Sequence, residues 1–252
     1  MNSRRSIVVV EDFYEDAPAV RDYSLRQSYY LPYEEDEEVE AGRKWATWWA
    51  SRFKSFEECP FKSSETLMEA LEDAVGERID MDRWRAPFPI DARSYKPLGN
   101  QQDGFRSCLW NCSFHVKPEN RQKPGDGIHN HVVDSWNSVG PDGWAGIIYL
   151  APAAPLDGGL FLWRNLNPEK QFDWMTAANN WRMVDRFGNV FNRLLLVRGD
   201  IPHSGAGGWG DCLETGRMYQ TFFFHTVARK TLWPVCVPDL RGRNGSSCGH
   251  SS

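Results

Sequence analysis

From about residue 100 onwards, the sequence is divided into short segments rich in β-branched and aromatic residues, which glycine and proline separate. These segments cover residues 106–116, 144–150, 160–163, 194–197 and 218–224. Short strands separated by turn residues are typical of a β-sandwich or a β-barrel. The sequence therefore predicts that the second half of the chain is mainly β.

Helices are predicted in the first half of the chain, next to one early strand. The β-branched run at residues 7–10 predicts a strand, and residues 17–27 have the apolar spacing of a helix. From Ser64 onwards, apolar residues recur at helical spacing as far as Gly76, which suits the left-handed residue at a helix end. We expect these helices to pack outside the barrel.

The chain is long enough to bury one substantial core, so a single domain is expected over residues 1–238. The barrel of this domain is predicted to start at about residue 100. The Gly- and Ser-rich tail, residues 239–252, has no apolar periodicity and is expected to be disordered.

One long insertion interrupts the predicted strands at residues 164–192. Within it, residues 176–187 have helical character, and Gly188 is the predicted end of that helix. Long excursions between strands often cover a site, so this helical insertion is expected to form a lid over the mouth of the barrel.

The balance of charge argues against several classes of partner. The chain carries 29 Lys and Arg against 34 Asp and Glu, a formal net charge of -5, so it offers no excess positive charge to a phosphate backbone. No apolar run approaches the roughly 20 residues needed to span a bilayer. We therefore expect a cytoplasmic protein that acts on a small molecule and binds neither nucleic acid nor a membrane.

Histidines cluster in the segment G-I-H-N-H-V-V-D-S-W-N. His129 and His131 are two positions apart, so in an extended strand they point to the same side, and Asp134 follows on the turn. His203 comes after another predicted strand, in I-P-H-S-G. Two histidines and one carboxylate leave open positions on a metal for O2 and a chelating co-substrate, which is the arrangement of non-haem iron(II) oxygenases.

The strand G-R-M-Y-Q-T-F-F-F supplies a candidate partner for the distal carboxylate of 2-oxoglutarate. Alternation places Arg217, Tyr219 and Thr221 on one face, and an arginine in so apolar a strand is costly unless it is paired. Arg217 is thus the predicted carboxylate ligand. Further candidates for binding the co-substrate are Tyr219, Thr221 and Asn111. The residues expected to line the substrate pocket are Tyr149, Trp163, Trp136 and Asn137.

The order of these motifs resembles that of the iron/2-oxoglutarate dioxygenase superfamily, in particular its small bacterial members. The resemblance covers roughly residues 7–226 and rests on H-N-H-V-V-D, G-W-A-G-I-I-Y-L, G-G-L-F-L-W, I-P-H-S-G and R-M-Y-Q-T-F-F-F. The family pattern is H-x-D/E, a distal His and then an Arg, which His129, His203 and Arg217 match. The resemblance implies a double-stranded β-helix, or jelly-roll barrel, with Fe(II), 2-oxoglutarate and O2 as cofactors.

The middle position of the family pattern differs in this chain, because His131 stands where a carboxylate is expected. Three ligand sets remain open: His129 with Asp134, His131 with Asp134, or a face of three histidines made by His129, His131 and His203. Halogenases of the superfamily lack the carboxylate so that chloride can bind iron. A histidine would fill that position, so halogenation is disfavoured.

The resemblance implies oxidation of an aliphatic C–H bond of a small molecule, with 2-oxoglutarate converted to succinate and CO2. An amino-acid derivative in bacterial natural-product biosynthesis is the expected substrate class. Hydroxylation is the default reaction, and desaturation or a radical cyclisation such as nitrocyclopropane formation stays open. The rival hypotheses are a three-histidine, cupin-like dioxygenase without 2-oxoglutarate and a non-catalytic jelly-roll binding module.

Overall fold

The structure is a computed structural model, and it describes residues 5–27, 29, 56–86, 110–120, 122–132, 138–167 and 180–227, with the backbone of 48–50. The helices are α1 (Ala17–Leu25), α3 (Glu65–Val75) and α4 (Met81–Arg85). The strands are β1 (Ile7–Val10), β2 (Trp48–Ala50), β3 (Arg78–Ile79), β4 (Phe114–Lys117), β5 (Trp144–Tyr149), β6 (Leu160–Asn165), β7 (Trp181–Phe187), β8 (Leu194–Arg198), β9 (His203–Gly205), β10 (Arg217–Phe224) and β11 (Thr226–Val227). The predicted disordered tail, 239–252, lies outside the described residues. No described helix combines the length and the apolar content that crossing a bilayer requires.

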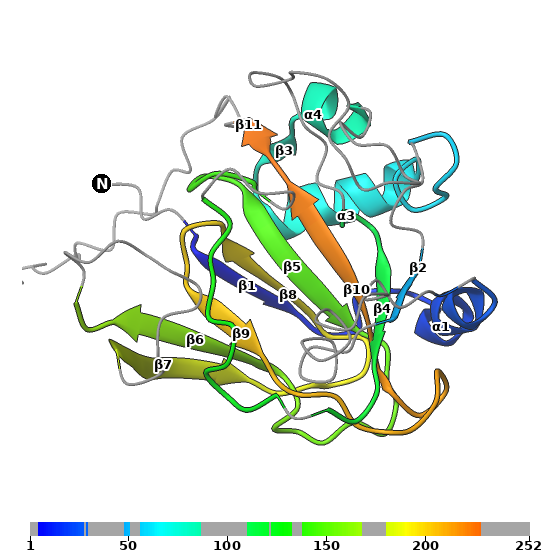
Figure 1. Ribbon diagram of the computed structural model, residues 1–252. Helices are drawn as coiled ribbons and strands as arrows, with labels where there is room; N and C mark the ends of the chain where they lie inside the picture. Colours follow the sequence, from blue (N-terminus) through cyan, green and yellow to red (C-terminus); the bar gives the residue numbers. More distant parts are fainter. Residues whose placement is uncertain are drawn as a thin grey trace, which may run out of the picture.

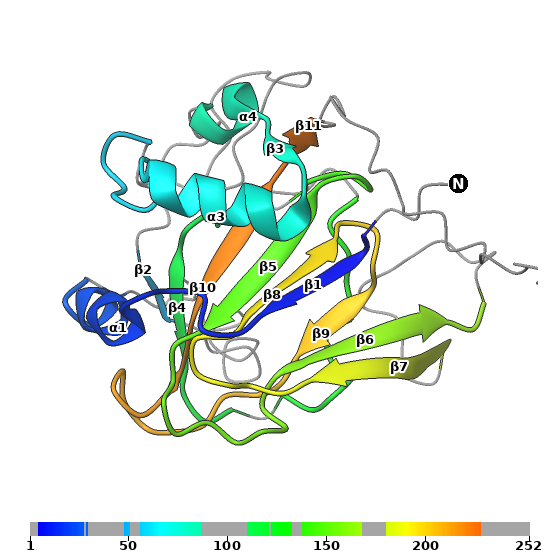
Figure 2. The same ribbon diagram turned by 180° about the vertical axis from the view of Figure 1, so that it is seen from behind.

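Two antiparallel sheets form the body of the molecule. The larger sheet has the strand order β1-β8-β5-β10-β4-β2, and the smaller one has the order β7-β6-β9. An isolated bridge between His129 and His203 adds the segment around residue 129 to the free side of β9. Figures 1 and 2 show β6, β7 and β9 as a layer of their own beside the larger sheet.

The chain passes repeatedly from one sheet to the other. It runs from β4 in the larger sheet to residue 129 in the smaller one, returns to β5, forms β6 and β7, and continues through β8, β9 and β10 in alternation. Antiparallel strands that alternate between two facing sheets define a jelly roll. The predicted double-stranded β-helix is therefore confirmed by the strand order itself.

The space between the two sheets of the jelly roll is filled by side chains from both of them. Alternate residues of each strand point inwards, as the pleat requires. The inward residues that pack together are Val139, Ala145, Ile147, Tyr149, Leu160, Leu162, Leu195, Val197, Tyr219 and Phe223. Since Leu160 and Leu162 come from the smaller sheet and the rest of the strand residues from the larger, this cluster joins the two layers.

The outer face of the larger sheet is covered by α3, which Figure 2 shows in front of β5 and β10. The buried face of α3 packs on Ile148, Leu194, Leu196 and Phe222 through Leu67, Met68, Leu71 and Val75. Ser64 begins the helix by accepting the backbone N–H of Leu67, and Gly76 ends it at φ 75°. The prediction of this helix is confirmed at both ends.

The predicted helical insertion is wrong where the structure describes it. Residues Trp181–Phe187 form β7, which pairs with β6, and Thr176 to Asn179 lie outside the described residues. Trp181, Val184 and Phe187 recur at every third position, which imitates helical spacing. Five of the seven residues of β7 are exposed, so this edge strand lacks the buried-and-exposed alternation that identifies a strand. Pairing with β6 decides its conformation.

A partly buried ion pair connects the end of β8 to the chain that follows α3. Arg198 donates to both carboxylate oxygens of Glu77, with Nη2–Oε1 at 2.6 Å and Nη1–Oε2 at 3.0 Å. The carboxylate also accepts from the hydroxyl of Thr226 at 2.6 Å. Burial raises the pKa of Glu77, but these hydrogen bonds and the one from Trp144 outweigh it and lower that pKa to about 2.

The Glu77→Gln variant is expected to lose on the order of 2–3 kcal/mol of unfolding free energy at pH 7, because Arg198 then stays buried without its counter-charge. A carboxyl with a lowered pKa stabilises the fold above its unfolded pKa, and this stabilisation is lost as pH falls from about 4.5 towards 2. Urea unfolding at several pH values should show the two proteins converging towards pH 2. Glu11→Gln, which breaks the exposed pair with Arg193, should cost less than about 1 kcal/mol.

Candidate metal centre

His129 and His203 are backbone partners across the edge of the smaller sheet. The N–H of His129 donates to the carbonyl of His203 at 3.0 Å, and the N–H of His203 donates back to the carbonyl of His129 at 2.8 Å. Residues directly opposite each other in an antiparallel pair project to the same side. The two imidazole rings therefore face each other, with centroids 4.5 Å apart.

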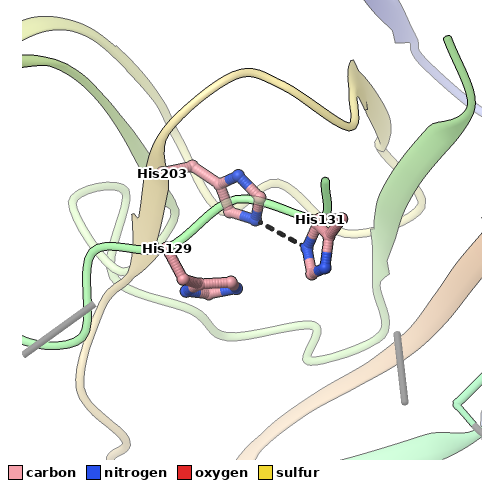
Figure 3. A group of neighbouring side chains, drawn as sticks. All are labelled: His129, His131 and His203. Carbon is pink, nitrogen blue, oxygen red and sulfur yellow. Dashed lines mark hydrogen bonds between the residues drawn. The ribbon is translucent and has the colours of Figure 1, made fainter. Parts of the chain in front are cut away.

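His131 brings a third imidazole to the same place. Its N–H donates to the carbonyl of Gly199 at 2.7 Å, which fixes the backbone two residues after the bridge. Its ring centroid is 5.0 Å from those of both other histidines, and its Nε2 is 3.2 Å from Nε2 of His203. One nitrogen from each ring lies within 4.8 Å of the others, so the three could hold one metal ion (Figure 3).

Hydrogen bonds fix which nitrogen of two rings is free to bind a metal. Nδ1 of His129 is 2.8 Å from the carbonyl oxygen of Gly127, and Nδ1 of His203 is 2.8 Å from that of Ile201. A carbonyl oxygen only accepts, so each Nδ1 carries the proton and each Nε2 keeps its lone pair. Backbone carbonyls that orient metal-binding histidines in this way are common at metal sites.

The surroundings of these rings also disfavour protonation. Burial, with a smaller contribution from His129, lowers the pKa of His203 to about 3. Burial likewise lowers the pKa of His129. Because a metal ion binds neutral imidazole, both rings are ready to coordinate at neutral pH.

The predicted ligand Asp134 lies outside the described residues, as do Trp136 and Asn137. Among the described residues, the group able to hold a metal consists of His129, His131 and His203. The structure thus brings together three of the four predicted ligands. Their assignment as ligands stays a prediction.

Comparisons with known proteins give distant structural likenesses. No family model matches the sequence, and no curated protein matches it. HygX from Streptomyces hygroscopicus, solved with nickel, 2-oxoglutarate and hygromycin B, is 10% identical at a TM-score of 0.44, over 94% of this chain and 90% of that chain. A prolyl hydroxylase from Trichoplax adhaerens, in complex with a hypoxia inducible factor peptide, is 15% identical at 0.39, over 88% and 84%. The Fe(II)/(alpha)ketoglutarate-dependent dioxygenase TqaL is 13% identical at 0.39, over 90% and 84%. Since each of these TM-scores is below 0.5, the fold and the site rest on the strand order and the residues.

Arg217 begins β10 on the inner face of the larger sheet, as the predicted alternation requires. It is 2% exposed, and it donates to the carbonyls of Gly158 and Gly159 at 3.0 and 3.3 Å. Its guanidinium lies 4.8 Å from the ring centroid of Tyr219. It forms no ion pair with any carboxylate of the described residues, so this buried charge lacks a counter-charge from that part of the chain.

Tyr149 adds a polar atom next to Arg217. The guanidinium carbon of Arg217 is 6.0 Å from the Tyr149 ring centroid. The Tyr149 hydroxyl is buried and has no hydrogen-bond partner within the described part of the chain. Burial raises the pKa of Tyr149 to about 12, so the hydroxyl keeps its proton and can donate it in a hydrogen bond. An unsatisfied buried donor beside an unpaired cation is a group of atoms suited to an anion.

Other predicted site residues are engaged in the fold. The hydroxyl of Thr221 donates to the carbonyl of Trp110 at 2.6 Å. The side-chain oxygen of Asn111 accepts the N–H of Phe223 at 3.0 Å. Both contacts brace the turn before β4 against β10, so the structure gives these two residues a structural role beside the site.

The structure describes the packing of Trp163, and its predicted place in the substrate pocket stays a prediction. Trp163 packs with Ile128, Phe161 and Trp181 on the outer face of the smaller sheet, and its indole N–H donates to Ser204 at 2.9 Å. Its neighbour Leu162 points inwards instead. Alternation separates the two faces of a strand, but a single sequence does not say which face is inside.

Two residues of β4 that were not predicted as site residues face the same interior. His115 lies opposite Tyr219 and stacks on it at 5.1 Å, and Lys117 lies opposite Arg217. The signal that could have found them is the alternation in F-H-V-K, which puts His115 and Lys117 on one face. The sequence does not show that β4 is the neighbour of β10, and this pairing is what brings the two residues to the site.

Proposed function

We propose that this protein is a non-haem Fe(II) oxygenase that uses 2-oxoglutarate as co-substrate. Three imidazoles from two neighbouring segments converge on one point, and a facial set of three ligands leaves three positions of an octahedral ion open. A bound iron would activate O2 there, at the expense of the 2-oxo acid.

The observation that carries this proposal is the buried, unpaired Arg217 in register with the histidines. His203 and Gly205 are both inward residues of β9, two positions or roughly 7 Å apart along a strand. Gly205 is also the residue that Arg217 approaches, since a Cβ atom added there would lie 3.4 Å from Nη1. The guanidinium therefore lies beside a strand position two residues from His203, a separation that a five-carbon dicarboxylate could span. Arg217 and the Tyr149 hydroxyl together would hold its distal carboxylate.

The chain's own residues bind the metal ion, orient the co-substrate and enclose the site. The histidines hold the ion, Arg217 fixes the far end of the co-substrate, and the aromatic interior around Tyr219 and Phe223 limits access of water. We propose a small molecule as substrate, with hydroxylation of an aliphatic carbon as the reaction. An amino-acid derivative in bacterial secondary metabolism fits this chemistry.

A three-histidine dioxygenase that needs no 2-oxoglutarate is the second candidate. It is favoured by one specific observation: His131, and not a carboxylate, completes the set among the described residues. In that case Arg217 would contact the substrate itself.

Anaerobic titration of the iron-loaded protein with 2-oxoglutarate distinguishes the two candidates. The proposal expects saturable binding, with a weak visible charge-transfer band, and oxygen-dependent succinate release afterwards. The zinc-loaded protein is the control, because it should bind 2-oxoglutarate without the band. No binding of 2-oxoglutarate to the iron protein would contradict the proposal and favour the second candidate.

A further inference from the structure

Lys117 lies next to the anion site and has no role in the function proposed above. In the register of the larger sheet it stands directly opposite Arg217, so both side chains project to the same side. Its ammonium group donates to Oε1 of Gln122 at 2.7 Å, and Nε2 of Gln122 donates to the carbonyl of Gly205 at 3.0 Å. Gly205 is the residue beside the guanidinium of Arg217. Lys117 is therefore tethered to the same point that Arg217 approaches.

The two cations are unfavourable neighbours in the absence of an anion. Like charges directly opposite each other on two strands destabilise a sheet. Neither Lys117 nor Arg217 forms an ion pair with a carboxylate of the described residues. Burial, with a smaller contribution from Arg217, lowers the pKa of Lys117 to about 7. A carboxylate placed between them would relieve this repulsion.

We propose that Lys117 is a second cationic contact for the distal carboxylate of 2-oxoglutarate and that it sets the selectivity for a dicarboxylate co-substrate. The inference rests on the proposed function. Arg217 supplies a planar fork for two carboxylate oxygens, whereas the lysine ammonium supplies a compact point charge from the neighbouring strand. Gln122 holds that ammonium in place before the co-substrate arrives.

The test compares two ligands on three variants of the iron-loaded protein without oxygen. 2-Oxoglutarate carries the distal carboxylate, and 2-oxobutyrate lacks it. Lys117→Met should raise the Kd for 2-oxoglutarate about 10- to 100-fold, the range for one charge-assisted hydrogen bond, and leave the Kd for 2-oxobutyrate within about twofold. Lys117→Arg should restore much of the selectivity. Lys123→Met removes an exposed lysine of the following loop and should change neither Kd.

Each outcome assigns a cause. If the wild-type protein does not bind 2-oxoglutarate, the proposed function fails, and this inference fails with it. If the wild-type protein binds it but Lys117→Met binds both ligands as tightly, or weakens both equally, only the role of Lys117 is overturned. A folded Lys117→Gln variant, checked by circular dichroism, gives the same comparison should the methionine variant not fold.

Discussion

Replacing His203 by alanine is expected to lower the affinity for Fe(II) by at least about 100-fold and to abolish 2-oxoglutarate-dependent O2 consumption. Loss of an outer partner of a metal ligand already costs 10- to 100-fold, and this change removes the ligand itself. The bridge between residues 129 and 203 is made by backbone atoms, so alanine at position 203 can keep it. The rings of His129 and His131 should therefore stay in place. Metal content after dialysis and succinate release measure the two effects.

His225→Ala is the matched control for this variant. His225 follows β10, and its carbonyl accepts the N–H of Asp80. It does not belong to the group of three histidines that could hold a metal. This variant should keep its iron and its activity. The parallel variant His131→Ala decides the third ligand, because unchanged iron affinity would assign that position to Asp134. Retained iron in His203→Ala itself would refute the metal centre.

Arg217→Met should bind iron normally and lose 2-oxoglutarate binding by about 100-fold or more. The guanidinium is a buried charge 6.0 Å from the ring centroid of Tyr149, and loss of a buried ionic partner costs about 3–5 kcal/mol. Methionine fills a similar volume, so the barrel is expected to stay folded. Anaerobic titration gives the Kd, and metal analysis confirms that the ion is present.

Arg193→Met provides the comparison for Arg217→Met. Arg193 pairs with the exposed Glu11 and donates to the carbonyl of Gly188, so co-substrate binding should change far less than in Arg217→Met. Unaltered 2-oxoglutarate affinity in Arg217→Met would mean that this guanidinium serves the fold through Gly158 and Gly159 alone.

The strands that form the barrel were predictable because their buried faces leave a pattern. The runs that became β5, β8 and β10 are mostly apolar on both faces, since one face meets the smaller sheet and the other packs against helices. The capping serine and the terminal glycine identified α3 in the same way. Local chemistry was sufficient wherever burial and local preference agreed.

Prediction failed where neighbouring strands decide the outcome. β7 is an exposed edge strand, and only its pairing with β6 makes it extended. Trp163 and Leu162 could be assigned to opposite faces but not to inside or outside. The position of Lys117 opposite Arg217 follows only from the pairing of β4 with β10. Contacts between strands far apart in the sequence are set by the fold as a whole.

The backbone bridge between His129 and His203 has a consequence for the protein without its metal. This bridge is a single pair of hydrogen bonds at a sheet edge, and such edges open more readily than central strands. An ion bound by both side chains would cross-link residues 129 and 203 and so stabilise the pairing of the two segments. It would also close the loop of chain between them. Removal of the metal by a chelator would then abolish activity and also let the sheet edge open at this bridge. Faster hydrogen exchange of the His129 and His203 amides would measure this opening.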